Sequence, residues 1–183
     1  MVAPPEPHGA RSDEWIRCLC SRNAQALVAL IEAGCAVDHR PGYARAPLHC
    51  AARWGLTEMV EALLAYHASP NRPDNLGRTP LHAAATGGHV PVIARLVLAG
   101  AAVNARDSVF GMTPLHCAAR HGHAEALWHL LWYGADREHR DAFGDTALTL
   151  AYRMRAREVI AYLRAPMPLR PLGTRGAPHR SKP

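Results

Sequence analysis

The chain has 183 residues and a formal net charge of +6, and its longest apolar runs, such as 26–31, are far too short to cross a membrane. Apolar residues make up 49% and charged residues 20%, which is typical of a globular protein of one domain with short tails. The N-terminal stretch MVAPPEPHGARSDE has no apolar core behind a basic start, so it does not predict a secretory signal. Together with an odd number of cysteines, five, this favours reduced thiols in an intracellular protein.

The first segment, 1–12, is predicted to be disordered, and a first helical unit is expected at 13–45. Asp13 is placed to cap the first helix of this unit, and Trp15 holds an apolar core position in it. The loop that follows departs from the later loops, because Ala44 stands where they carry a turn glycine.

From residue 46 onward, one motif recurs at a fixed spacing. The stretch APLHCAARWGL at 46–56 is followed by TPLHAAATGGH at 79–89, TPLHCAARHGH at 113–123 and a degraded copy, TALTLAYRMRA, at 146–156. The starts of successive copies are 33, 34 and 33 residues apart. Such self-similarity marks a repeat architecture. The units after the first are therefore 46–78, 79–112, 113–145 and 146–165, which makes five in all.

The unit 79–112 shows how one copy is expected to fold. Thr79 is a good N-cap residue, and Pro80 suits the first helical position, where its missing N–H costs nothing. Two glycines at 87–88 end this helix, and apolar residues at helical spacing predict a second helix at about 90–99. The rest of the unit crosses back as an extended loop with a tight turn.

The unit 146–165 is expected to close the array as an atypical end. Thr149 and Arg155 replace the histidine and the glycine of the other copies. The tail 166–183 carries four basic residues and no acid, and we predict a disordered, solvated extension, with nuclear import or contact with an anionic surface as the alternative. Nucleic-acid binding is not expected, because the basic residues do not form a stripe on the folded part.

The motif TPLH-x-A, followed by a glycine–histidine pair, an apolar helix, G-A-x-V-N and D-x-x-G, resembles the ankyrin repeat over about 13–165. The resemblance implies an all-α solenoid of about five stacked helix-turn-helix repeats with protruding β-turn loops. It also implies a non-enzymatic module that binds other proteins through the loop tips and the first helix of each pair. No cofactor and no small-molecule substrate are expected.

Histidines recur at two motif positions: His49, His82 and His116 at one, and His89 and His123 at the other. We interpret them as structural, with imidazoles that bond to backbone atoms of neighbouring loops, because zinc needs about four ligands at one point and these are spread along the array. A catalytic pairing of Cys117 with His121 or His123 is disfavoured, because no acid or oxyanion donor accompanies it. Cys50 and Cys117 share one motif position and are expected to be small core residues.

Residues that bind a partner are expected at positions that packing does not require, and binding hot spots are rich in tryptophan, tyrosine and arginine. The ends of the first helices and the loop tips supply Tyr43, Arg45, Arg53, Trp54, Leu76, Arg78, Phe110, Met112, Arg120, His121, Phe143 and Arg153. Trp54 is the strongest candidate, with packing on a neighbouring loop as the alternative. Aromatic and arginine side chains along one groove predict a partner with acidic and apolar features, such as a helix or an extended peptide.

Two smaller sets of residues carry further hypotheses. Trp128 and Trp132, four residues apart on the outer helix of the fourth unit, form a second candidate contact patch, with packing against the last unit or the tail as the alternative. Asn71 and Asn104 hold the position that, by resemblance to the family, an oxygen-sensing asparaginyl hydroxylase modifies, and each follows a leucine eight residues earlier.

The main prediction is a small adaptor or masking inhibitor, monomeric alone and cytoplasmic, nuclear or both. Lys182 is the only lysine among 21 basic residues, which a GC-rich coding bias explains. The alternative is a lysine-poor surface that resists ubiquitination, as would suit the substrate-recognition subunit of a ubiquitin ligase. Against that alternative, the tail shows no helix pattern resembling a recruiting box.

Overall fold

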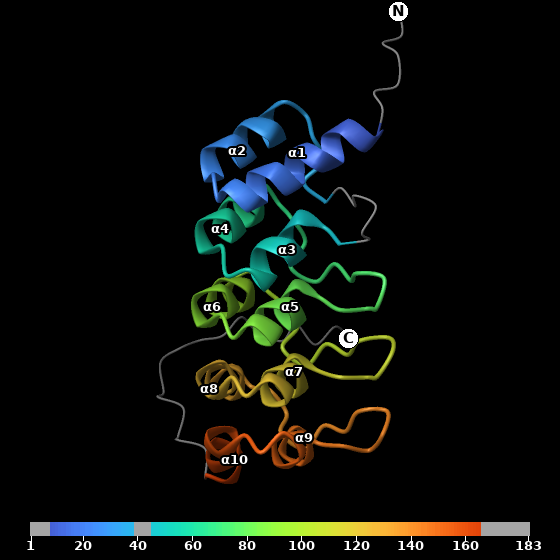
Figure 1. Cartoon of the computed structure of the whole chain (residues 1–183), viewed down its shortest axis with the longest axis vertical. Helices are drawn as coiled ribbons and strands as arrows, with labels where there is room; N and C mark the ends of the chain where they lie inside the picture. The colour runs from blue at the N-terminus through green and yellow to red at the C-terminus, as the bar shows by residue number, and fades with distance from the viewer. Residues whose placement is uncertain (1–7, 39–44, 166–183) are drawn as a thin grey trace, which may run out of the picture.

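The computed structural model describes residues 8–38 and 45–165, and the regular structure in these ranges is entirely helical. Within the described residues, ten helices form five pairs that stack in one column (Figure 1). Their bounds are α1 His8–Ser21, α2 Ala24–Glu32, α3 Pro47–Arg53, α4 Thr57–Ala65, α5 Pro80–Gly87, α6 Val90–Leu98, α7 Pro114–His121, α8 Ala124–Trp132, α9 Ala147–Arg153 and α10 Arg157–Arg164. This is the all-α array of paired helices that the repeat spacing predicts.

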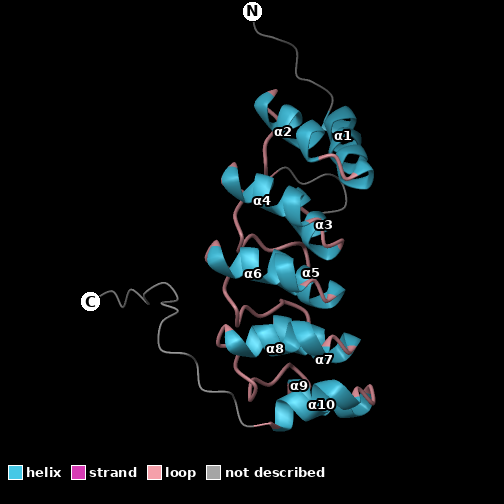
Figure 2. Cartoon of the chain, turned by 90° about the vertical axis from the view of Figure 1, so that its left-hand side faces the viewer, coloured by secondary structure: helices cyan, strands magenta, loops and turns pink. Residues whose placement is uncertain are grey.

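The helices lie in two layers. The odd-numbered helices form one layer and the even-numbered helices the other, and the long loops between pairs project beyond the odd-numbered layer (Figure 1). Each helix contacts the equivalent helix of the next pair, as the stacked pairs in Figure 2 show. Every unit therefore buries its apolar faces against its neighbours along the column.

The core repeats one pattern from unit to unit. α5 contributes Leu81, Ala84 and Ala85, all fully buried, and α6 contributes Ile93 and Leu96. The alanines let neighbouring helices of the odd-numbered layer approach closely, while the larger side chains fill the space between the layers. Dense packing of this kind is the main source of helix stability, because helices of seven to nine residues are marginal in isolation.

The start of the first unit differs from its prediction. α1 begins at His8, so position 13 lies inside the helix and not directly before its first residue, and the helix enters the segment that was expected to be disordered. Trp15 is buried with 1% of its surface exposed, which confirms that it takes the place of the core leucine.

The predicted caps are present in the central units. Thr79 and Thr113 stand before α5 and α7 with extended backbone, and each forms a reciprocal capping box with the histidine three residues later. Gly88 and Gly122 end the two helices in the left-handed conformation, with φ of 74° and 76°. Glycine adopts this conformation without the cost that a Cβ would add.

His82 holds the end of its own unit, at the point where the chain passes into the next helix pair. Its Nε2 donates a hydrogen bond to the Met112 carbonyl at 3.0 Å, so the proton is on Nε2 and Nδ1 is an acceptor. That Nδ1 receives the Thr79 N–H at 3.1 Å and the Thr79 hydroxyl at 2.9 Å. His116 repeats the arrangement with the Asp145 carbonyl at 3.1 Å. The structural interpretation of these histidines is confirmed.

His49 makes only part of this network. Its Nε2 donates to the Arg78 carbonyl at 2.9 Å, but its buried Nδ1 has no partner. The reason is in the sequence, because Ala46 stands where the later units carry the threonine hydroxyl. The histidine contact that holds the end of the second unit therefore lacks the cap contact found in the third and fourth units.

We expect mild acid to destabilise the fold. Burial lowers the pKa of His49, His82 and His116, and it outweighs the carbonyl hydrogen bonds that raise the pKa. Above about pH 6.5 these imidazoles are neutral in both folded and unfolded chains, so they add no pH dependence there. Below it the unfolded chain binds protons that the folded chain resists, and the free energy of unfolding falls. Urea unfolding midpoints measured from about pH 8 down to about pH 5 should be flat and then decline, and a midpoint that rises or stays constant would contradict this account.

Candidate functional site

A cleft of about 470 Å³ opens between α3 and the loop that follows α4, on the side of the projecting loops. We call it the Trp54 cleft, and it is lined by Ile16, Arg45, Cys50, Trp54, Asp74, Asn75 and Leu76. Trp54 is 46% exposed and Leu76 is 39% exposed, although both side chains are large and apolar. The cleft therefore presents apolar surface that the fold leaves uncovered, with a charged pair at its rim.

The turn opposite Trp54 is held by one aspartate. Asp74 is buried, and its Oδ1 accepts the N–H groups of Leu76 and Arg78 at 2.8 and 2.9 Å. Gly77 completes the turn with φ of +73°, and a Cβ there would lie 2.5 Å from the Ser108 backbone nitrogen. The same Ser108 N–H donates to the Leu76 carbonyl at 2.8 Å, so neighbouring loop tips are joined and Leu76 is presented rigidly.

The rim of the cleft is basic. Arg45 Nε lies 3.4 Å from Asp74 Oδ2, which partly neutralises that arginine. Arg45, Arg53 and Arg78 line a smaller adjoining hollow of about 40 Å³. Arg78 pairs with Asp107 at 3.7 Å, whereas Arg53 has no ion pair with any residue in 8–38 or 45–165. An acidic group on a partner could therefore pair with Arg53 at little desolvation cost to this chain.

The positive field extends to the neighbouring helix ends. The pKa of His121 is lowered by burial first, and then by His123, Arg53 and Arg120. Arg53 and Arg120 hold equivalent positions near the ends of α3 and α7, so both lie on the same edge of the column.

Two predicted loop-tip aromatics contact each other further along the column. The rings of Phe110 and Phe143 lie 5.9 Å apart between centroids at a tilt of 31°. Phe143 is 74% exposed, and the Ala142 N–H donates to the Phe110 carbonyl at 2.7 Å. These tips continue the apolar character of the Trp54 cleft but do not line it.

Several predicted site residues lie elsewhere. The expectation that Met112 is a surface residue is wrong: its side chain is 4% exposed and packs in the core, while its carbonyl holds His82. Arg153 is paired with Asp145 at 2.7 Å. Tyr43, Ala44 and the tail lie outside the described residues.

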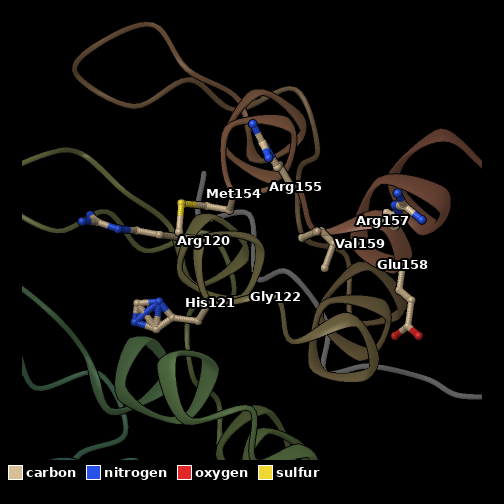
Figure 3. A pocket seen from close by; sticks show the side chains of 9 residues that line it. Arg120, His121, Gly122, Met154, Arg155, Arg157, Glu158 and Val159 are labelled. Carbon is tan, nitrogen blue, oxygen red and sulfur yellow. The ribbon is translucent and has the colours of Figure 1, made fainter.

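Arg120 and His121 line a second pocket, of about 450 Å³, with residues of the α9–α10 connection (Figure 3). The sequence reasoning did not anticipate this pocket, nor that Ile16 and Cys50 would line the Trp54 cleft. Cys50 is half-buried beside that cleft, unlike Cys117, which is buried as expected.

The second predicted patch is partly buried. Trp128 and Trp132 stack on each other with 5.4 Å between ring centroids and 17° between planes, and each is of intermediate exposure. Trp128 also meets His129 edge-on at 5.0 Å. The pair therefore covers much of its own apolar surface.

The two candidate hydroxylation residues bridge successive units. Asn71 donates to the Gly100 carbonyl at 2.8 Å and accepts the Ala102 N–H at 2.7 Å. Asn104 makes the equivalent bonds, at 3.2 Å to the Gly134 carbonyl and 2.9 Å from the Asp136 N–H. Both side chains are exposed.

The environment of Cys117 does not activate its thiol. Burial raises the pKa of Cys117 to about 11, so the thiol is protonated at neutral pH. His123 is occupied by a hydrogen bond from its Nε2 to the Thr86 carbonyl at 3.1 Å. Within the described ranges no three His, Cys, Asp or Glu residues gather as they would around a metal ion, and no helix is long and apolar enough for a membrane span.

Comparisons with known proteins agree with this geometry. The sequence profile described as ankyrin repeats (3 copies) matches residues 16–107 and 87–167. Rabankyrin-5 of Homo sapiens is 35% identical over 105 residues, which are 51% of this chain and 9% of that protein. Neurogenic locus notch homolog protein 4 of Homo sapiens is 38% identical over 77 residues, which are 42% of this chain and 4% of that protein. ARF GTPase-activating protein GIT1 of Homo sapiens is 37% identical over 76 residues, which are 41% of this chain and 10% of that protein. The chain thus matches no more than about a tenth of the length of these relatives, and the repeats are what it shares with them. With its profile match, its stacked helix pairs and its inter-unit histidines, the chain belongs to the ankyrin-repeat family.

Proposed function

We propose that this chain binds a partner protein through the Trp54 cleft and the arginines beside it, acting as a small adaptor or as an inhibitor that masks the partner's surface. The observation that carries the proposal is the exposure of Trp54 in an apolar cleft with the unpaired Arg53 next to it. Ankyrin repeats are generally non-catalytic interaction modules, and the described residues offer a docking surface of the kind such modules use.

The chemistry of the cleft selects a class of partner. An apolar side chain of the partner can occupy the space between Trp54 and Leu76, and an acidic residue beside it can pair with Arg53. Tryptophan and arginine are the side chains that most often dominate binding energies, because each combines a large contact area with a polar end. The favoured partner is therefore an acidic segment with an apolar anchor, met in the cytoplasm, the nucleus or both.

A double variant, Trp54→Ala with Arg53→Ala, is expected to lower partner affinity by at least about thirtyfold, because removing an anchor of this kind costs about 2 kcal/mol or more. The thermal unfolding curve should hardly change, since both side chains are exposed. The measurement is quantitative mass spectrometry of proteins captured by the tagged chain, followed by titration of the enriched partner. Leu98→Ala is the matched control, because Leu98 is 76% exposed and lies outside the cleft. Equal capture by the double variant and the control would move the binding site away from Trp54.

The scarcity of lysine favours a second candidate, the substrate-recognition subunit of a ubiquitin ligase. Lys182 is the only lysine in the chain, so the described surface has no ubiquitin acceptor of the usual kind. The same capture experiment separates the two: cullin or elongin subunits would favour the ligase role, and a single stoichiometric protein such as a kinase or a transcription factor would favour masking.

We also propose that Asn71 and Asn104 are substrates of an asparaginyl hydroxylase. Both side chains are exposed at equivalent positions, and both span the junction between two units. Peptides containing each asparagine should carry one added oxygen when the chain is isolated from cells with an active hydroxylase. Unmodified peptides at both sites under those conditions would rule this out.

A further inference from the structure

Two junctions between units are filled by an imidazole. His89 Nε2 donates to the Arg53 carbonyl at 3.0 Å, and His123 Nε2 donates to the Thr86 carbonyl at 3.1 Å. Each ring lies against a glycine at the end of the first helix of the preceding pair. A Cβ on Gly88, for example, would come within 2.6 Å of His123 Nδ1. At these junctions the ring, the carbonyl and the glycine form one fitted set.

The last junction has the carbonyl and the glycine but lacks the ring. Ala156 stands where the histidine would be, and a Cβ added to Gly122 would meet no atom within 4 Å. No hydrogen bond from the described residues reaches the Arg120 carbonyl, which is the equivalent of the two carbonyls that accept imidazoles. The space is the pocket of about 450 Å³ between α7 and the α9–α10 connection, which we call the notch (Figure 3).

The surroundings of the notch are strongly basic. Arg120 extends from the end of α7, Arg155 belongs to the α9–α10 connection and Arg157 is the first residue of α10; all three line the notch, and their side chains point in different directions (Figure 3). None of these arginines has an ion pair within the described part of the chain, and Glu158 is the one acid that lines the pocket. The opening therefore combines a free carbonyl acceptor and a glycine floor with unneutralised positive charge.

We propose that the notch is a docking site for a histidine side chain of an acidic partner segment. The two filled junctions show that an imidazole fits between such a glycine and carbonyl, with its Nε2–H donated to the carbonyl. The arginines select aspartates and glutamates beside that histidine. The chain's own tail holds one histidine, His179, but it stands next to Arg180 and near Lys182 with no acid in 166–183, so charge disfavours the tail as the occupant. This site is separate from the Trp54 cleft and does not depend on it.

The test uses the full chain and two fluorescent peptides that are identical except at the centre, where one carries a histidine and the other an alanine between aspartates and glutamates. Fluorescence anisotropy should show about tenfold tighter binding of the histidine peptide, the effect expected for one hydrogen bond and a buried ring. Backbone amide signals of Gly122 and Ala156 should shift on its addition. Equal affinities would mean that charge alone attracts the peptides, and shifts confined to the Trp54 cleft would place the peptide elsewhere; either result overturns the proposal.

Substitutions at position 156 test directly whether the notch binds the histidine. Ala156→His supplies the ring from within the chain, so it should remove the preference for the histidine peptide, and a retained preference would overturn the proposal. If that variant does not fold, Ala156→Leu should narrow the same space and weaken the preference, since the corresponding pocket at the first junction, where Leu56 holds this position, is about 290 Å³. Trp54→Ala should leave the preference intact, which separates this test from that of the proposed function. A chain that ends at residue 165 and gains affinity for the histidine peptide would identify the tail as the occupant and reject the partner segment.

Discussion

Replacing His82 by alanine is expected to lower the free energy of unfolding by about 3–5 kcal/mol. The imidazole is fully buried, and its loss leaves the Thr79 N–H and the Met112 carbonyl without partners inside the protein. Each buried, unpaired group costs about 1–3 kcal/mol, and the space left by the ring adds to this. Urea unfolding at neutral pH, followed by circular dichroism, measures the difference.

The control for this variant lies at the same motif position in the last unit. Thr149 stands where His82 does in its unit, but it is exposed, and its hydroxyl bonds to that of Thr146 at 3.1 Å. Thr149→Ala should therefore change stability by less than about 0.5 kcal/mol. If the two substitutions had similar effects, the buried histidines would not be what holds the end of each unit in place.

Gly88→Ala should cost about 2–4 kcal/mol, whereas Gly122→Ala should cost about 1–2 kcal/mol. Both glycines have nearly the same left-handed φ, 74° and 76°, so the backbone strain added by a Cβ is the same. Only at Gly88 would the Cβ meet an imidazole, at 2.6 Å from His123 Nδ1, and displace it from the Thr86 carbonyl. Unfolding free energies of the two variants give the contribution of the ring contact as their difference.

A double-mutant cycle isolates that contact. In a His123→Ala background the Cβ at position 88 has no ring to displace, so Gly88→Ala should cost no more than Gly122→Ala does in the natural chain. Equal costs for Gly88→Ala with and without His123 would show that the ring is not fitted against the glycine.

The sequence was sufficient for the parts of the fold that depend on local geometry. The position of Thr79 before Pro80, and of Gly88 after the apolar stretch, predicted the ends of α5, because each residue type suits one backbone conformation. The burial of Trp15 followed from its register with the leucines of other units. The structural role of the histidines followed from their recurrence.

The exposure of single side chains could not be predicted in the same way. Met112 aligns with Arg45 and Arg78, which line the surface, yet it is buried because an apolar side chain at that place can turn inward where a guanidinium cannot. The start of α1 at His8 was missed because the segment lacks a cap signal. The sequence hinted at the notch, because Ala156 replaces the histidine found at this position in two other units. The same replacement is, however, also expected in a terminal unit that only closes the array. The open space beside Gly122 depends on how the last two units pack, which the sequence alone does not fix.

The ties between units have an evolutionary consequence. An imidazole that donates to a backbone carbonyl binds a group that every residue possesses. The side chain of the accepting residue is therefore unconstrained, and Arg53 and Thr86 serve equally well. Units built this way can be duplicated, lost or exchanged without any change to the hydrogen bonds that join them. The outward positions are thus free to diversify at each copying event, and a family of long and short arrays can present unlike surfaces on one mode of assembly.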